Sequence, residues 1–376
     1  MVERAEKLGL VLQGGGARGA YQVGALKAIG EIWGQRQSPF QIISGTSVGA
    51  INAAPLAAAS TDFRRGTKRL EKLWSGLRCD SIFKTHPAAI AGSSARWVWS
   101  FVAGGFGMGK PCSLLDNKPL ETLLNNAFQR DGIDRSIHRG ALHALCITAS
   151  SYGEGSSITF IEAIDGIEEW DRARRKGRRT TIGTEHLMAS AALPFVFPAK
   201  RVGQRLFGDG ALRLTAPLAP AIHCGAKKLL VIGVRDNEEA ASVCEVPEPY
   251  PSMGDMGGHA LDILFNDDLD ADYERLERIN HTVSLLPPEV LSQTNLREID
   301  LCSLQPSKDL RVIAAKYKSE MPHTIRLLLK SIGAWGDDSR LISYLLFEPG
   351  YINALIELGY KDVIARRDEV AGFLQK

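Results

Sequence analysis

Apolar runs and amphipathic stretches alternate along the N-terminal part of the chain. Residues 8–12 form a continuous apolar run that ends in glycines, and residues 40–44 form a second short run that leads into another glycine. Such runs are typical of strands buried in a parallel sheet. Between them, residues 21–33 place apolar side chains at helical spacing, and residues 48–59 are rich in alanine. The pattern predicts a strand–helix–strand–helix unit with a right-handed crossover.

The rest of the chain continues this mixture of elements, and its composition changes after about residue 240. The pattern predicts helices at 62–78, 119–130, 261–279 and 339–376, the last broken at Pro349-Gly350, and strands at 142–149, 157–163, 206–208, 228–234, 282–286 and 298–304. We expect an α/β fold in which a mainly parallel sheet is flanked by helices in three layers. No linker separates the two parts of the chain. We therefore expect one domain over residues 8–235 and a largely helical extension over residues 236–376 that packs on it.

Composition and charge exclude several classes of function. Of the 376 residues, 44% are hydrophobic and 23% are charged, which suits one large domain or a domain with an extension. The net charge of +2 provides no strong field for nucleic acid. The six cysteines form no CxxC pair, so we expect reduced core thiols and no zinc ribbon. We find no metal-ligand spacing and expect no cofactor.

A serine lies in a turn of small residues directly after the second predicted strand. Gly45-Thr46-Ser47-Val48-Gly49 matches the G-x-S-x-G pattern, which presents a serine hydroxyl on a sharp bend between a strand and a helix. Upstream, the loop Gly14-Gly15-Gly16-Ala17-Arg18-Gly19 leaves backbone N–H groups bare, and such groups stabilise an oxyanion. A nucleophile and an oxyanion hole in one short unit indicate acyl chemistry.

Two other interpretations of these motifs are weaker. Gly14-x-Gly16-x-x-Gly19 also matches the dinucleotide-binding fingerprint, but no acidic residue follows the second strand and Arg18 has no role there. An α/β-hydrolase would add a histidine after its acid. His223 is the best candidate for that role, although a structural histidine is the commoner case.

An acidic motif and a small-residue block complete the candidate site. Asp209 lies between Gly208 and Gly210 at a predicted strand end, followed by Ala211, which leaves its carboxylate accessible or forms an ordinary Asp-Gly turn. Residues 189–198 combine small residues with a Pro-bounded aromatic loop, which suits either an acyl-chain groove or the core.

Along the chain, the glycine loop comes first and is followed by the Ser47 turn, residues 189–198 and the Asp209 motif. In this order the four motifs resemble the patatin-like phospholipase family over roughly residues 8–235. The resemblance implies a Ser–Asp dyad without a catalytic histidine, with Ser47 as nucleophile and Asp209 as base. It implies that Gly14, Gly15 and Gly16, supported by Arg18, form the oxyanion hole. Ala211 replaces a glycine that many members have. The implied activity is hydrolysis of (phospho)lipid esters through an acyl-serine; acyl transfer and non-catalytic lipid binding are the alternatives.

The sequence also bears on membrane contact. No stretch reaches the ~18 apolar residues that a transmembrane helix needs, and residues 8–12 are too short for a signal peptide. We expect a cytoplasmic protein, with peripheral contact at the inner face of the membrane left open and the oligomeric state unknown. The six cations within residues 172–179 would attract anionic headgroups. Trp97, Trp99 and Phe101 lie near glycines, as in an interfacial lid; solvated charge and core packing are the alternatives.

Overall fold

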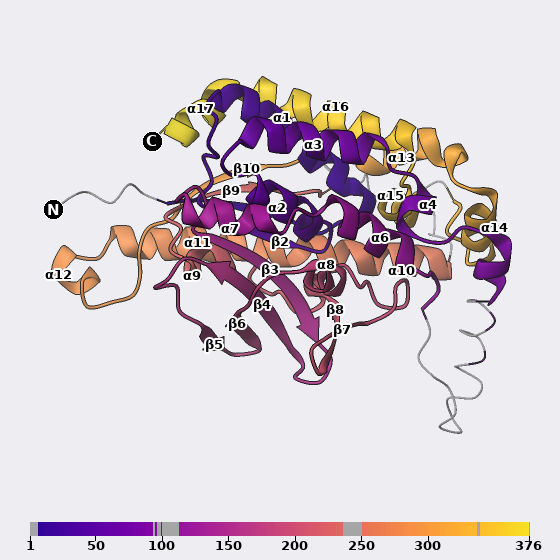
Figure 1. Ribbon diagram of the computed structural model, residues 1–376, viewed down its shortest axis with the longest axis horizontal. Helices are drawn as coiled ribbons and strands as arrows, with labels where there is room; N and C mark the ends of the chain where they lie inside the picture. Colours follow the sequence, from indigo (N-terminus) through magenta and orange to yellow (C-terminus); the bar gives the residue numbers. More distant parts are fainter. Residues whose placement is uncertain are drawn as a thin grey trace.

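A ten-stranded sheet runs through the protein, with helices on both of its faces (Figure 1). The computed structural model describes residues 7–92, 95, 99, 113–235, 250–336 and 339–375. The main strand order is β10-β9-β1-β2-β3-β4-β6-β5, and β8 joins β3 and β7 off this path. The strands are β1 (Leu8–Leu12), β2 (Ile42–Thr46), β3 (Ala144–Ser151), β4 (Ser156–Ala163), β5 (Trp170–Arg172), β6 (Arg175–Arg179), β7 (Lys200–Val202), β8 (Arg205–Asp209), β9 (Lys228–Ile232) and β10 (Asp300–Leu304).

Helices fill the intervals between the strands. Those before β9 are α1 (Ala20–Trp33), α2 (Val48–Ala58), α3 (Phe63–Ser75), α4 (Cys79–Ile82), α6 (Lys118–Ala127), α7 (Asp131–His138), α8 (Thr184–Ser190) and α9 (Ala219–His223), with short 3₁₀ turns η1 (Gly16–Gly19) and η2 (Gly210–Leu212). Those after β9 are α10 (Met253–Asp262), the π-helical turn η3 (Ile263–Asp267), α11 (Asp268–Ser284), α12 (Pro288–Leu291), α13 (Leu310–Tyr317), η4 (Lys318–Glu320), α14 (His323–Ser331), α15 (Arg340–Leu345), α16 (Pro349–Ala365) and α17 (Arg367–Gln375).

The central strands are buried on both faces, which confirms the three-layer α/β prediction. Strands β10, β9, β1, β2 and β3 are mutually parallel. In β1, Leu10 and Leu12 face the larger core, whereas Val11 faces the smaller one. Alternate side chains point to opposite faces of a strand, so a strand covered on both faces reads as a continuous apolar run.

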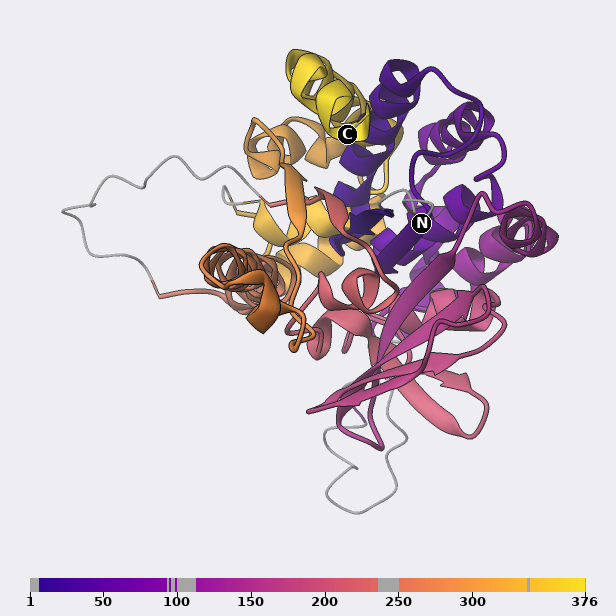
Figure 2. The ribbon, with the colours of Figure 1, turned by 90° about the vertical axis from the view of Figure 1, so that its left-hand side faces the viewer.

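Two unequal layers of helices supply these cores. The larger core includes apolar residues of α1, α2, α3 and α16, and Figures 1 and 2 show α1 and α16 side by side above the sheet. The smaller core lies beneath α9 and α11 and includes Ala221, Leu269 and Leu276. Among the described helices, none is long and apolar enough to span a membrane.

The C-terminal segment is integrated into the same body. Strand β10 pairs with β9 in parallel, and α16 packs along α1. A Cβ atom on Gly24 would overlap the carbonyl of Ile356, and one on Gly359 would overlap the carbonyl of Tyr21. The two helices therefore approach so closely that only glycine fits at these two contact points.

One predicted strand is wrong and one break is placed differently. Residues 282–284 are the last residues of α11, and Leu285 and Leu286 follow its end. Val283 is buried on the same side as Leu276, because the helical spacing of apolar positions continues to the end of this helix. Pro349 does interrupt the C-terminal helices, but it does so as the first residue of α16, where its missing N–H costs nothing. The strand predicted at 298–304 is confirmed as β10.

The segments proposed for membrane contact are only partly described. Trp97 and Phe101 lie outside the described residues, and Trp99 is exposed. The basic run forms the β5–β6 hairpin, in which Lys176 pairs with Glu154 at 2.7 Å and Arg178 pairs with Asp171 at 2.6 Å. Acidic side chains thus partly neutralise this run, and its attraction to anionic lipid remains a prediction.

The close contact of α1 and α16 gives a stability prediction. Gly24→Ala should lower the free energy of unfolding by about 1–3 kcal/mol, because the added methyl group forces two packed backbones apart. Gly372→Ala is the control, since a Cβ there meets nothing within 4 Å on α17 and should raise stability by about 0.5–1 kcal/mol. Urea denaturation followed by circular dichroism measures both. Equal effects of the two substitutions would contradict this packing.

Candidate active site

Ser47 lies on a sharp bend between β2 and α2, at the carboxyl end of the sheet. Its backbone has φ 55° and ψ −125°, a conformation that non-glycine residues rarely adopt. A Cβ on Gly45 would overlap the carbonyl of Gly49, and a Cβ on Gly49 would overlap the carbonyl of Leu12. The two motif glycines are thus required for the bend to close against β1.

The hydroxyl of Ser47 donates a hydrogen bond of 2.6 Å to Oδ2 of Asp209. Asp209 ends β8, which pairs with β3, and its carboxylate is fully buried. Its second oxygen, Oδ1, accepts the N–H of Ala211 at 3.0 Å. Burial raises the pKa of Asp209 to about 7, and the hydrogen bonds from Ser47 and Ala211 only partly oppose that rise. A carboxyl with this pKa suits proton transfer near neutral pH.

Ser190, from the small-residue block, ties the serine turn to the sheet. Its Oγ accepts the backbone N–H of Ser47 at 2.9 Å and donates to the carbonyl of Thr148 at 2.6 Å. The adjoining carbonyl of Ala192 accepts the N–H of Asp209 at 2.8 Å. The block therefore holds both Ser47 and Asp209, a role that its sequence alone did not indicate.

The glycine loop lies against the serine turn. A Cβ on Gly14 would come within 3.0 Å of the Cβ of Ser47. Gly15 and Gly16 have φ values of 156° and 55°, and a Cβ on Gly16 would overlap the carbonyl of Tyr344. Only glycine combines this backbone with such close approaches. Gly16 and Ser47 line the same pocket.

Arg18 anchors the loop to the C-terminal segment. Its guanidinium is fully buried, donates to Oγ of Ser343 at 2.9 and 2.7 Å, and lies 3.6 Å from the carboxylate of Asp262. It also stacks over the ring of Tyr344, 3.9 Å from the centroid. Arg18 therefore contacts both α10, through Asp262, and α15, through Ser343 and Tyr344.

A buried network of uncharged polar side chains supports the loop from below. Asn52 accepts the indole N–H of Trp74 at 2.7 Å and donates to Oε1 of Gln22 at 2.9 Å. Gln22 donates to the carbonyl of Gln13 at 2.8 Å, and the side chain of Gln13 accepts the N–H of Val234 at 3.0 Å. Because buried polar groups are costly when unpaired, this network holds the residue before the glycines in one position.

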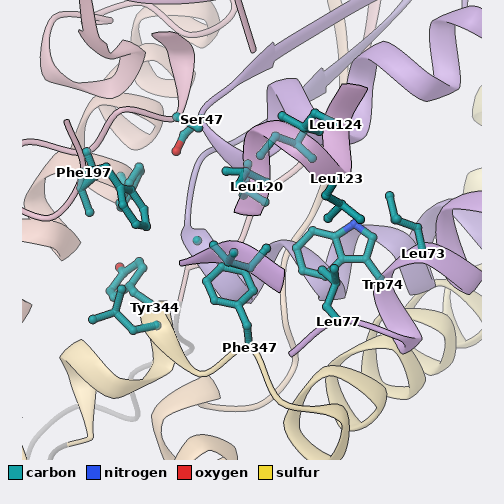
Figure 3. A pocket seen from close by; sticks show the side chains of 18 residues that line it. Ser47, Leu73, Trp74, Leu77, Leu120, Leu123, Leu124, Phe197, Tyr344 and Phe347 are labelled. Atoms are coloured by element: carbon teal, nitrogen blue, oxygen red, sulfur yellow. The ribbon is translucent and has the colours of Figure 1, made fainter. Parts of the chain in front are cut away.

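An apolar pocket opens beside Ser47 (Figure 3). Helices α2, α3 and α6 provide one side of it, and the C-terminal segment provides another through Tyr344, Leu345 and Phe347. Phe265, in the π-helical turn, stacks on Tyr344 with ring centroids 5.5 Å apart. The lining is almost entirely aliphatic and aromatic, which suits a hydrocarbon chain.

Histidines take other positions. None of the hydrogen bonds of Ser47 or Asp209 within the described residues involves a histidine. His223 stacks on Trp170 with ring centroids 4.5 Å apart, on α9 beneath the other face of the sheet. His186 accepts the N–H of Gly183 at 3.0 Å. No group of acidic, histidine or cysteine side chains in the described parts of the chain is arranged to hold a metal ion.

Comparisons with known proteins find a matching family model and several similar solved structures. The sequence model of the patatin-like phospholipase family matches residues 10–222. A search of the curated proteins gave no match. Similar solved structures include VipD from Legionella pneumophila (12% identity, 97% of this chain, 67% of that chain, TM-score 0.38), human GIVD cytosolic phospholipase A2 (12%, 100%, 60%, 0.43) and Pseudomonas aeruginosa ExoU with SpcU (15%, 91%, 70%, 0.27).

The chain therefore spans 60% to 70% of the length of these three proteins. Their identity to this chain is low, so the family assignment rests on the sequence model. That model covers more than half of the chain, including the glycine loop, the Ser47 turn and Asp209. The chain belongs to the patatin-like phospholipase family.

Proposed function

We propose that this protein is a serine acyl hydrolase that cleaves carboxylic esters of lipids through a Ser47–Asp209 dyad. The observation that carries the proposal is the hydrogen bond of 2.6 Å between the two side chains at the side of an apolar pocket. A buried carboxylate with a raised pKa acts as a base without an intervening histidine. The pocket holds the acyl chain of the substrate.

Catalysis has two halves. The Ser47 oxygen attacks the ester carbonyl while Asp209 accepts the hydroxyl proton, and the tetrahedral oxyanion then expels the alcohol, which takes that proton from Asp209. Water next attacks the acyl-serine and gives a proton to Asp209. When the second oxyanion collapses, Ser47 leaves as the alkoxide, recovers the proton and releases the free fatty acid.

Backbone N–H groups stabilise the oxyanion in this proposal. The N–H of Ser47 is already bonded to Ser190, so it is not the donor. The N–H groups of the Gly14–Gly16 loop, beside the serine, fill that role, and the N-terminus of α2 adds partial positive charge. Arg18 acts by fixing the loop to α15.

We also infer that the C-terminal extension belongs to the catalytic unit. Tyr344 and Phe347 line the acyl pocket, and Ser343 binds the arginine of the glycine loop. A chain ending at residue 235 would lack one wall of the pocket. The boundaries 8–235 and 236–376 therefore divide the sequence by composition, and both parts build the site.

The dyad gives a first prediction. Ser47→Ala and Asp209→Asn should each reduce hydrolysis of a soluble p-nitrophenyl ester by about 10³-fold or more, since each removes one member of a unit that acts together. Single histidine replacements, such as His223→Ala and His186→Ala, should retain activity within about tenfold of wild type. A folded histidine variant as inactive as Ser47→Ala would replace the dyad with a triad.

The buried carboxyl gives a second prediction. The pKa of Asp209 is about 7 in the folded chain, whereas an unfolded aspartate titrates near 3.9. Between these values the folded state holds a proton that the unfolded state has released. The contribution of Asp209 to the free energy of unfolding therefore falls as pH rises, by up to about 1.4 kcal/mol per pH unit.

Asp209→Asn removes this titration, so the variant should gain stability relative to the wild type as pH rises from about 4 to about 7. Urea denaturation of both proteins at several pH values measures the difference, and the other titrating groups cancel in the comparison. A stability difference that does not change with pH would mean that Asp209 titrates normally in the folded protein.

A further inference from the structure

A second groove lies beyond the acyl pocket, on the same three helices. It runs between α2, α3 and the end of α6. Its floor is made of small or apolar residues, including Pro55 and Ala58 of α2 and Ala59 directly after it. Its rim is polar, and Arg69 donates to Gln129 across it at 3.0 Å. An apolar floor with a wet rim suits an aliphatic chain that lies close to the surface.

Three leucines separate the groove from the acyl pocket. Leu73, Leu77 and Leu123 line both cavities, so the partition between them includes these side chains. In Figure 3 the three lie around Trp74, across the pocket from Ser47. Leu73 and Leu123 are only half-buried. Leucine side chains change rotamer without a backbone rearrangement, so this partition can open for a chain that pushes through it.

The helix that follows Ser47 leads from one cavity to the other. Val48 and Ile51 line the acyl pocket, and Pro55 and Ala58 line the groove, at spacings that place all four along one side of α2. From Ser47 to Pro55 the helix rises about 12 Å. With C–C bonds of about 1.5 Å, an extended hydrocarbon chain advances about 1.25 Å per carbon, so about ten carbons cover this distance.

We propose that the groove holds the distal part of a long acyl chain, with Leu73, Leu77 and Leu123 as a gate between the reacting end and the tail. This inference rests on the proposed function, because it takes Ser47 as the attachment point of the chain. It makes long-chain acyl groups, longer than about ten carbons, the substrates that the protein binds best. Shorter chains occupy the acyl pocket alone.

A substitution that fills the groove but leaves the acyl pocket unchanged tests this proposal. Ala127 lines only the groove, at the end of α6, so Ala127→Trp fills it. Asn125→Trp is the matched control, since Asn125 is exposed on the same helix and lines neither cavity. The readout is kcat/KM for p-nitrophenyl butyrate, octanoate, palmitate and stearate.

In the wild type, kcat/KM should rise from octanoate to palmitate, because each buried CH₂ group contributes up to about fourfold. Ala127→Trp should lower the palmitate and stearate values at least tenfold and leave the butyrate and octanoate values within twofold. Asn125→Trp should change none of them. A uniform loss across all four esters, or an unchanged palmitate value in Ala127→Trp, would overturn the gate and the groove.

Palmitate binding, measured by calorimetry, separates this inference from the proposed function. If the wild type hydrolyses none of the esters, butyrate included, the hydrolase proposal is wrong. The proposal that the groove binds the acyl tail is then supported if Ala127→Trp weakens palmitate binding at least tenfold relative to Asn125→Trp. The proposal is wrong if the two variants bind palmitate equally.

Discussion

The site depends on one buried hydrogen bond, from the Ser47 hydroxyl to the Asp209 carboxylate. Burying a carboxylate away from water costs free energy, and the raised pKa of Asp209 reflects that cost. The surrounding structure holds the two residues together in spite of it. Two strand ends bring them to the same edge of the sheet, and the Ser190 block accepts a backbone N–H from each of them.

The C-terminal segment also helps to hold Ser47 and the glycine loop in position. The glycine loop fits between the serine turn on one side and the carbonyl of Tyr344 on the other. Arg18 inserts its buried guanidinium among Ser343, Asp262 and the Tyr344 ring. Helix α16 then fixes this segment against α1 through paired glycines. The geometry at Ser47 is thus linked to contacts made by residues near the end of the chain.

The parts of the fold that the sequence predicted are local. The β1–α1–β2 unit and the turn at Ser47 are encoded within neighbouring residues, as apolar runs, helical spacing and glycines. A short apolar run such as residues 282–286 does not distinguish a strand from the end of a helix. The preceding residues of α11 continue the helix through residues 282–284.

The parts that the sequence did not predict depend on long-range contacts. Ser190 lies 143 residues from Ser47, and nothing in its own segment indicates that it binds the serine N–H. The Gln13–Gln22–Asn52 network reads in the sequence as three isolated polar residues, and it becomes a support for the glycine loop only when β1, α1 and α2 pack. The residues that line the acyl pocket likewise come from distant segments, including α3, α6 and α15.

The central claim is that Asp209 alone activates Ser47. The most direct test is the rate at which a small fluorophosphonate labels Ser47, measured as a function of pH. In the wild type the labelling rate should rise with an apparent pKa of about 7, and in Asp209→Asn it should be at least ~10²-fold slower at every pH. Equal labelling of the two proteins, or a pH dependence that disappears on replacing a histidine, would contradict activation by Asp209 alone.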